Sequence, residues 1–436
     1  MTLVLAGGIV VVVLCLISMQ MVFVWRYYRL LSRDFEGVEE HSAEVGQAPI
    51  AVGAWAPEVA IVLCLRGADP SLMECLSGVA LQEYRNFQLH LVVDNINDPA
   101  LDVVDDFFQT LTPPPVHVIS NLTGNCSLKC AAILEAITAI ATSVEIFAFL
   151  DADTVPDQNW LRDLIAPLAD PQIGATTGNR WFSPWRPTFG SYVRQIWNAA
   201  AIVQMAEYNI GWGGSFAIKR SALVTTDLPQ RWGQAFCEDT MLSSVLEKSN
   251  LQLFRVSNLI CENTETTTMT GACSWIVRQL VTVRLYHFRW SIINLHGWAT
   301  LSGSLVGPLA AVALYFLPDR APFYAVCSAI VFYQVSNLVL LILIQRINLK
   351  VIDRRDGINQ QDRMPANIFM QLIAVLLVQY IHFWSCCTAQ NLRRLRWRGI
   401  EYEISQKNRI RMREYVPYCD FESTTNSASE SSQSVG

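Results

Sequence analysis

The sequence predicts an α/β domain joined to membrane-spanning helices, with one such helix before the domain and about three after it. Of its 436 residues, 52% are hydrophobic and only 16% are charged, against about 25% charged residues in an average soluble domain. Long apolar runs lie towards both ends of the chain. Between them, short apolar runs alternate with helix-like stretches, which is the pattern of an α/β sheet.

The first apolar run, residues 2–25, has no charged residue and is long enough to cross a hydrocarbon core of about 30 Å. A cleaved signal peptide is the alternative, but it would begin with basic residues and end at a small-residue cleavage site. This run begins without a basic residue and ends at Arg26. We therefore predict a transmembrane helix over residues 1–25 and a linker over residues 26–53.

Three more apolar runs, at residues 297–317, 323–345 and 368–388, predict a C-terminal transmembrane region over 297–388. Arginines and lysines follow the first run and separate the last two, which places both segments and the intervening domain in the cytoplasm. If all four apolar runs crossed the membrane, the basic segment 389–420 would lie outside the cytoplasm, whereas basic segments next to membrane spans normally lie inside it. An interfacial or re-entrant late segment would remove this conflict, which the sequence leaves open.

Residues 54–274 carry the α/β pattern, with helical stretches at 71–82 and 127–141. Strands are predicted at residues 59–65, 87–93, 116–120, 146–150 and 251–256. The pattern favours a largely parallel sheet, and such sheets bind ligands beyond the carboxyl ends of their strands. We therefore expect a nucleotide-binding architecture.

Composition excludes some partners. The formal net charge is −6, so no global basic field is available to hold nucleic acid. The 12 Cys residues show no Cys-x-x-Cys pair and are interpreted as small buried hydrophobes with reduced thiols. Residues 421–436 are rich in Ser and poor in apolar residues, which is typical of a disordered tail.

Carboxylates follow two of the predicted strands. Asp151 and Asp153 stand two residues apart where a buried strand ends, so their oxygens can converge on one hard ion such as Mg²⁺ or Mn²⁺. That ion could bridge the phosphates of a nucleotide-sugar, with helix capping as the alternative role. Asp94 ends an earlier strand, where it could bond a base or ribose, or make a turn with Asn95.

Other candidates lie downstream. Glu238 and Asp239 precede a helix-like stretch, where a carboxylate acts either as a helix cap or as a general base. The segment 211–215 could let the backbone approach a sugar closely, or it could be a plain loop. Its candidate sugar or acceptor contacts are Trp212, Gly213, Gly214 and Ser215.

The stretch 275–296 mixes Trp, Ile, Val, Leu, Tyr and Phe with Arg278, Arg284 and Arg289, just before the second apolar run. We predict that it forms an interfacial helix that extends its arginines towards headgroups or the site. An ordinary amphipathic surface helix is the alternative.

The order of these motifs resembles inverting family 2 glycosyltransferases, most closely the ceramide glucosyltransferase branch and its bacterial relatives. The segments that carry the resemblance are residues 65–72, 93–94, 125–129, 150–153, 177–182, 213–215 and 238–239. The segment 397–402 also looks like the Trp-Arg-Gly segment that follows the last span in this branch.

This resemblance implies a GT-A fold, a Rossmann-like nucleotide-sugar-binding domain. In it Asp94 contacts the uridine, Asp151 and Asp153 handle the metal and the diphosphate, and Asp239 deprotonates the acceptor hydroxyl. Lys129 matches a basic residue near the nucleotide, with a solvated surface lysine as the alternative.

Arginines complete the expected donor site. Arg66 belongs to the first of the matching motifs. The family's closing motif is Gln or Arg, two residues, Arg and Trp; Arg278 fits its first position, but the Arg-Trp pair is missing. Either Arg284 supplies the missing cation or the contacts to the diphosphate and acceptor differ.

Together these features predict a multi-pass integral membrane glycosyltransferase with its catalytic domain facing the cytoplasm. We expect transfer of a hexose from a UDP-sugar to a lipid hydroxyl, ceramide-like or another membrane lipid, with inversion and with Mg²⁺ or Mn²⁺. A processive polysaccharide synthase is the first alternative, disfavoured by the few spans and the incomplete closing motif. A catalytically degenerate membrane scaffold is the second, disfavoured by three retained acidic sites.

Overall fold

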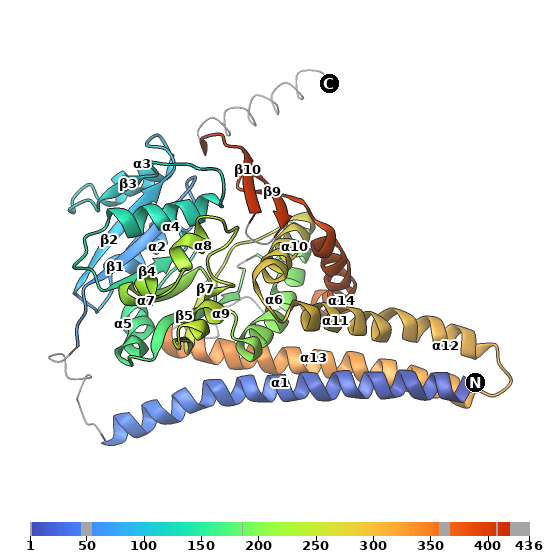
Figure 1. Ribbon diagram of the computed structural model, residues 1–436. Coiled ribbons are helices and arrows are strands. Elements are labelled where there is room, and N and C mark those ends of the chain that lie inside the picture. The colour runs from blue at the N-terminus through green and yellow to red at the C-terminus, as the bar shows by residue number, and fades with distance from the viewer. Residues whose placement is uncertain (1, 45–54, 185, 357–366, 407–408, 419–436) are drawn as a thin grey trace. The chain divides into compact units, whose positions relative to one another are not determined.

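The computed structural model describes residues 2–44, 55–184, 186–356, 367–406 and 409–418 (Figure 1). The chain divides into two compact units. The sheet unit comprises Val45–Arg180, Asn209–Cys261 and Leu392–Gly436, and the helical unit comprises Met1–Glu44, Trp181–Tyr208 and Glu262–Asn391. The expected domain 54–274 is therefore not one contiguous unit, because its residues 181–208 and 262–274 belong to the helical unit.

Within the described residues, the sheet unit contains a seven-stranded sheet in the order β3-β2-β1-β4-β6-β5-β7. Strands β3, β2, β1 and β4 are parallel, whereas β6 is antiparallel to both β4 and β5. The expected α/β class is confirmed, but the sheet is mixed rather than largely parallel. The strands are β1 (Val59–Leu65), β2 (Phe87–Val93), β3 (Val116–Val118), β4 (Ile146–Leu150), β5 (Ile173–Phe182), β6 (Ser215–Lys219) and β7 (Gln252–Asn263).

Central strands β1 and β4 are apolar along their whole length, and every residue of β4 is buried. A strand covered by helices on both faces needs such a continuous apolar run. In the register of these strands Leu65 pairs with Val93, so the carboxyl ends of β1 and β2 share one edge of the sheet. Because antiparallel β6 pairs its first residue, Ser215, with Leu150, the start of β6 lies at that edge too.

Short helices connect the strands of the sheet unit. They are α2 (Leu72–Ala80), α3 (Ala100–Phe107), α4 (Leu128–Ala139), α5 (Trp160–Ile165), α7 (Arg220–Thr225), α8 (Leu228–Trp232) and α9 (Leu242–Lys248), with a 3-10 turn at Ala166–Ala169.

A pair of histidines joins β2 to β3. The rings of His90 and His117 are stacked with centroids 5.3 Å apart, and His90 Nδ1 lies 3.1 Å from His117 Nε2. Burial, together with the neighbouring His117, lowers the pKa of His90 from 6.5 to about 4. Folding therefore favours the neutral imidazole.

We expect the thermal stability of the protein to fall as the pH is lowered from 6.5 towards 4. In this window the unfolded chain protonates His90 while the folded chain does not, so the stabilisation present above pH 6.5 is lost, by on the order of 3 kcal/mol. His90→Gln should flatten the pH dependence of the melting temperature, and His117→Gln should flatten it less. Equal slopes for wild type and His90→Gln would contradict this assignment.

The basic segment expected over residues 389–420 contains a three-stranded antiparallel sheet in the order β10-β9-β8. Its strands are β8 (Arg394–Trp397), β9 (Ile400–Gln406) and β10 (Arg409–Glu414). The turn between β8 and β9 places Arg398 and Gly399 at φ values of 45° and 79°, as two-residue hairpins require. Alternating buried residues of β9, such as Tyr402, give this C-terminal sheet its apolar face.

The C-terminal sheet is attached to the seven-stranded sheet by hydrogen bonds. Met412 N donates to the Gly124 carbonyl at 2.7 Å, and Leu128 N donates to Tyr402 Oη at 3.2 Å. The Tyr402 ring also lies edge-on to Phe236, with centroids 5.3 Å apart. The C-terminal sheet is thus a fixed part of the sheet unit.

The helical unit contains the long apolar helices expected before and after the α/β domain. Among the described residues, four stretches are long and apolar enough to cross a membrane: Ala6–Ser32, Trp290–Tyr315, Ala321–Arg355 and Ile368–Asn391. The expected arrangement of one N-terminal and three C-terminal apolar helices is confirmed. The elements of the unit are α1 (Thr2–Glu44), α6 (Phe189–Tyr208), α10 (Met269–Tyr286), α11 (Trp290–Leu301), a π segment (Ser302–Val306), α12 (Gly307–Tyr315), α13 (Ala321–Asp356) and α14 (Ile368–Asn391).

Helices α1 and α13 run side by side (Figure 1). Val13, Leu16 and Ile17 of α1 form a buried cluster with Tyr333 of α13. Further along, Tyr27 Oη donates to Asn348 Oδ1 at 2.6 Å, a buried polar contact between the same helices. The N-terminal apolar helix therefore packs against an apolar helix from the far end of the sequence.

The stretch 275–296 is not one helix, contrary to expectation. Helix α10 ends at Tyr286 and α11 begins at Trp290. Between them His287 has extended backbone, its Nδ1 accepts a hydrogen bond from Arg289 N at 3.3 Å, and its Nε2 lies 3.2 Å from the Tyr208 carbonyl. These local bonds compete with the helical ladder and end α10.

Candidate active site

Charged side chains from α4, from the loop after β4 and from the loop before α9 meet at the end of the sheet where β1, β2 and β4 end and β6 begins. At their centre is Lys129, in the first turn of α4. Its Nζ lies 2.7 Å from Asp151 Oδ1 and 2.7 Å from Glu238 Oε1, and it donates to the Gly213 carbonyl at 3.0 Å. One ammonium thus links the loop after β4, the loop before β6 and the loop before α9.

The local backbone explains why these groups converge. Ser127 caps α4 by accepting a hydrogen bond from Cys130 N at 3.2 Å, which fixes the turn that carries Lys129. Ser127 N donates to the Ala235 carbonyl at 2.8 Å, which holds the segment leading to Glu238 beside α4. Asp151 N donates to the Gly214 carbonyl at 3.1 Å and extends the β4–β6 pairing by one residue.

The three charges depend on one another. Burial alone would lower the pKa of Lys129, but the carboxylates of Asp151 and Glu238 raise it well above its ordinary value. Burial raises the pKa of Glu238, and the Lys129 ammonium opposes that rise. The cluster therefore holds a permanent positive charge between two acidic groups.

Asp239 lies beside this cluster and is more accessible than its neighbour. Its Oδ2 accepts a hydrogen bond from Gly213 N at 2.7 Å, and its Oδ1 accepts one from Thr240 Oγ1 at 2.9 Å. Glu238 is only 3% exposed, whereas Asp239 is half-buried. Of these two carboxylates, Asp239 is the one that a small acceptor group could approach.

Asp151 and Asp153, the predicted metal ligands, both lie in the turn that follows β4. Burial raises the pKa of Asp153, and the charge of Asp151 raises it further, so a divalent cation would relieve their repulsion. No group of three or more His, Cys, Asp or Glu side chains able to hold a metal occurs in the described part of the chain. Two carboxylates, completed by phosphate oxygens and water, suit the way Mg²⁺ is held at phosphate-transfer sites.

The glycines before β6 have a packing explanation. A Cβ atom on Gly213 would lie 2.0 Å from Glu238 Oε1, and one on Gly214 would lie 2.3 Å from the Trp212 ring. Ser215 is fully buried, and its hydroxyl accepts a hydrogen bond from Trp160 Nε1 at 2.8 Å. For Gly213, Gly214 and Ser215 the structure thus favours close packing over the predicted sugar contact.

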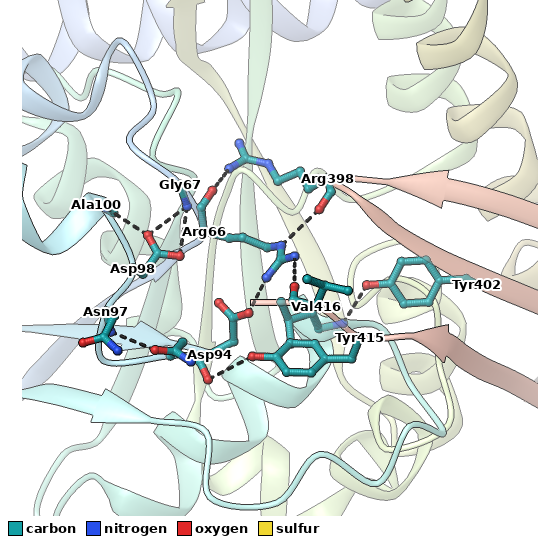
Figure 2. A network of polar contacts seen from close by, with 12 residues as sticks. Arg66, Gly67, Asp94, Asn97, Asp98, Ala100, Arg398, Tyr402, Tyr415 and Val416 are labelled. Atoms are coloured by element: carbon teal, nitrogen blue, oxygen red, sulfur yellow. Dashed lines mark hydrogen bonds and ion pairs between the residues drawn. The ribbon is translucent and has the colours of Figure 1, made fainter. Parts of the chain in front are cut away.

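Figure 2 shows a second polar network, at the ends of β1 and β2. Arg66, the first residue after β1, forms a buried ion pair with Asp94, the first residue after β2. Its Nε donates to the Arg398 carbonyl at 3.0 Å and its Nη2 to the Val416 carbonyl at 2.8 Å. Asp94 and Arg66, both expected near the nucleotide, are thus brought together.

Two residues of this network, Asp98 and Arg398, were not predicted as site residues from the sequence. Asp98 accepts hydrogen bonds from Gly67 N at 2.9 and 3.1 Å and holds the left-handed turn after β1. Arg398 Nη1 donates to the Arg66 carbonyl at 2.8 Å, and its Nη2 lies 3.3 Å from Asp69 Oδ2. The only sequence signal for Arg398 is its place in the Trp-Arg-Gly segment.

Arg278 and Arg284 lie on α10, in the helical unit. Arg284 Nη1 donates to the Gln390 carbonyl, near the end of α14, at 2.8 Å. Their expected contacts with the diphosphate stay predictions. Trp212, the remaining expected residue, is buried, with the Arg180 guanidinium 5.4 Å from its ring centroid.

Residues 60–228 match the family described as Glycosyl transferase family 2. Over these residues the predicted resemblance to this family and the predicted GT-A-like α/β domain are confirmed. No curated protein matches the chain at a significant level. The ceramide glucosyltransferase branch thus remains an expectation.

Similar solved structures include a mannosyltransferase from Pyrobaculum calidifontis in complex with GDP-Man and Mn²⁺, with 15% identity, a TM-score of 0.42, and coverage of 86% of this chain and 99% of that one. Glucosyl-3-phosphoglycerate synthase from Mycobacterium tuberculosis, in complex with Mn²⁺, UDP-Glc and PGA, has 11% identity and a TM-score of 0.34, with coverage of 52% and 76%. These similar proteins bind Mn²⁺ together with a nucleotide-sugar.

Proposed function

We propose that this protein transfers a hexose from a UDP-sugar to the hydroxyl group of a membrane lipid, with inversion at the anomeric carbon. The observation that carries the proposal is the position of Asp239. It is a half-buried carboxylate next to the Lys129 and Glu238 pair, at the ligand-binding edge of a family 2 glycosyltransferase domain. The long apolar helices of the same chain favour a lipid as the acceptor.

In the proposed reaction the acceptor oxygen attacks the anomeric carbon in line with the departing diphosphate. Asp239 takes the hydroxyl proton as the new C–O bond forms, and the bond from the anomeric carbon to the diphosphate oxygen breaks. Lys129, held between Asp151 and Glu238, adds a fixed positive charge close to the leaving group. A single displacement of this kind inverts the anomeric configuration.

Asp151 and Asp153 would hold the divalent ion, Mg²⁺ or Mn²⁺, which when bound neutralises charge on the diphosphate. Asp94 and Arg66 would lie at the nucleoside end of the donor, since they follow β2 and β1, the strands on the side of β4 away from β6. Arg278 and Arg284 are proposed as further diphosphate contacts.

We expect Asp153→Ala to weaken binding of Mn²⁺ in the presence of UDP by at least about tenfold, because one of two carboxylate ligands is lost. Paramagnetic resonance of free Mn²⁺ measures this without any turnover. Asp102→Ala, which removes an exposed carboxylate on α3, is the matched control. Unchanged Mn²⁺ binding by the Asp153 variant would remove this residue from the metal site.

We further propose that the chain crosses the bilayer three times and that α14 lies at the cytoplasmic surface. The C-terminal sheet is bonded to the seven-stranded sheet, so both lie on one side of the membrane. Three candidate spans separate Cys261 from Leu392, and an odd number of crossings would put the two sheets on opposite sides. One of the three therefore does not cross.

Helix α14 is the segment best suited to a surface position. It packs against α6 and α10, neither of which is a candidate span among the described helices. It buries the polar residues Gln371, Gln379 and Ser385, and its His382 Nδ1 accepts a hydrogen bond from Trp197 Nε1 of α6 at 3.1 Å. This placement puts the basic residues after α14 in the cytoplasm, which removes the conflict in the charge rule.

Reporter fusions test this topology. A phosphatase that is active only outside the cytoplasm should be inactive when fused to the C-terminus and active when inserted at Asp319, in the turn before α13. Insertion at residue 50, in the linker predicted from the sequence between the first apolar run and β1, is the cytoplasmic control. An active C-terminal fusion would show four crossings and contradict the surface placement of α14.

Turnover tests the function itself. The purified protein, incubated with radiolabelled UDP-hexoses and a membrane lipid extract, should move label into one extractable glycolipid. Label in a growing polymer would indicate a polysaccharide synthase instead. Absence of any transfer, with every UDP-hexose and each metal ion tried, would contradict the proposed function.

A further inference from the structure

The last described residues of the chain, 415–418, lie against Arg66 and Asp94, the residues proposed to bind the nucleoside of the donor. We call them the C-terminal strap. They follow β10 directly and contact the residues that end β1 and β2 (Figure 2). Tyr415 Oη donates to the Asp94 carbonyl at 3.3 Å, and the Val416 carbonyl accepts a hydrogen bond from Arg66 Nη2 at 2.8 Å.

The strap also fills the space in front of the turn after β1. The Tyr418 ring lies 2.5 to 2.8 Å from the position that a Cβ atom on Gly67 would take. The Arg66 guanidinium is 6.0 Å from the Tyr415 ring centroid and 5.7 Å from that of Tyr418. Two aromatic rings and one backbone carbonyl of the strap thus close over a single arginine.

As a result, Asp94 is inaccessible in this conformation. Its side chain is 0% exposed, and its Oδ2 is engaged by Arg66. Its Oδ1 is buried and has no hydrogen-bond partner among the described residues. A buried carboxylate oxygen without a donor is unfavourable, and a nucleobase N–H is a donor that could satisfy it.

We propose that the C-terminal strap is an autoinhibitory cover that must move away from Asp94 and Arg66 before a nucleoside diphosphate can bind. This inference rests on the proposed function, because it takes Asp94 as the nucleoside contact. The strap would compete with the donor in two ways. Tyr418 occupies space beside the backbone of Gly67, and the Val416 carbonyl occupies a guanidinium N–H of Arg66.

The anchored C-terminal sheet limits the movement to the strap. β10 is held by the bond from Met412 N to the Gly124 carbonyl, and β9 by the bond from Leu128 N to Tyr402 Oη. The strap itself is attached through the Val416 carbonyl, which accepts a hydrogen bond from Arg66, and through Tyr415 Oη, which donates one to the Asp94 carbonyl. The strap can therefore open by a rotation of the backbone after Glu414, where β10 ends, while the C-terminal sheet stays in place.

The first test is the affinity of the full-length protein for UDP and, separately, for GDP, by equilibrium titration. If the nucleotide binds only when the strap is open, the apparent association constant is the intrinsic constant multiplied by the fraction of molecules whose strap is open. Tyr418→Ala should therefore tighten nucleotide binding, by about three- to tenfold. Tyr415→Phe, which removes one hydroxyl bond to a carbonyl, should tighten it less. Tyr84→Phe removes an equivalent bond, to the Pro57 carbonyl at 2.5 Å, at the other end of β1 and is the matched control.

The second test is hydrogen exchange of residues 409–418 with and without UDP. A cover that opens exposes the strap amides, so their exchange should speed up with nucleotide while β9 stays protected. Weaker binding by Tyr418→Ala, or slower strap exchange with UDP, would overturn the proposal, since the strap would then be part of the bound site. Absence of nucleotide binding by every variant and by the wild type would instead count against the proposed function.

Discussion

Asp239→Asn should lower the rate of sugar transfer by roughly 10²- to 10⁴-fold, the usual effect of losing a general base. The asparagine oxygen can still accept the hydrogen bond that Gly213 N gives to Asp239 Oδ2 at 2.7 Å, so the loop before β6 should keep its conformation. UDP binding should stay within about twofold of wild type, because a base without donor contacts affects only the chemical step. Single-turnover transfer and equilibrium UDP titration measure the two effects separately.

The neighbouring carboxylate provides the comparison. Glu238 is buried and paired with Lys129, so Glu238→Gln should disturb the charge cluster and lower both stability and donor affinity. Asp170→Asn, an exposed aspartate of the same unit, should leave every measurement unchanged. Near wild-type transfer by Asp239→Asn would move the base elsewhere, with Glu238 as the next candidate.

Lys129→Met should be the most destabilising single change in the site. It leaves the buried Glu238 carboxylate and that of Asp151 without their shared cation, and breaking a buried pair from one side costs about 3 to 5 kcal/mol. The melting temperature of the purified protein should fall clearly. UDP affinity should fall as well, because the pair of carboxylates would then face the diphosphate unscreened.

A double variant separates the charge effect from a packing effect. Lys129→Met combined with Glu238→Gln removes both members of the most buried pair, so it should recover part of the lost stability. Lys248→Met, at the exposed end of α9, is the control for loss of a lysine. No recovery in the double variant would show that Lys129 acts through its packing and not through its charge.

The centre of the fold and part of the site were predictable from local pattern. β1, β2 and β4 were predicted at the bounds that the structure gives them. β1 and β4 are uninterrupted apolar runs, as buried parallel strands need to be. Once these strands are placed, the carboxylates of Asp94 and Asp151 necessarily lie at their carboxyl ends. The convergence of Lys129 with Asp151 follows from the β-α connection, although its bond to Glu238 could not be read from the sequence.

The polar strand β5 was not predicted from the sequence. β5 contains Thr176 and Thr177, which are buried because each makes a hydrogen bond that no sequence pattern reveals. Thr176 Oγ1 donates to the Leu164 carbonyl at 2.6 Å, and Thr177 Oγ1 accepts from Trp212 N at 2.9 Å. A central strand can therefore be polar when its hydroxyl groups are satisfied, and hydropathy then gives no signal.

The C-terminal sheet was missed for a different reason. Ile400, Tyr402 and Ile404 alternate with charged or polar residues, a visible strand pattern, but the excess of arginine around them was interpreted as a membrane flank. The contacts of this segment are also remote: Arg66 and Val416 are 350 residues apart. Local periodicity carries no information about such pairs.

The anomeric configuration of the product tests the central claim most directly. Transfer from a UDP-α-hexose to a lipid hydroxyl by one displacement, with Asp239 as the base, must give a β-linked glycolipid. Proton coupling constants of the purified product distinguish the two anomers. A β-linked glycolipid, formed by the wild type and lost in Asp239→Asn, is the predicted result, and an α-linked product would contradict the single-displacement mechanism.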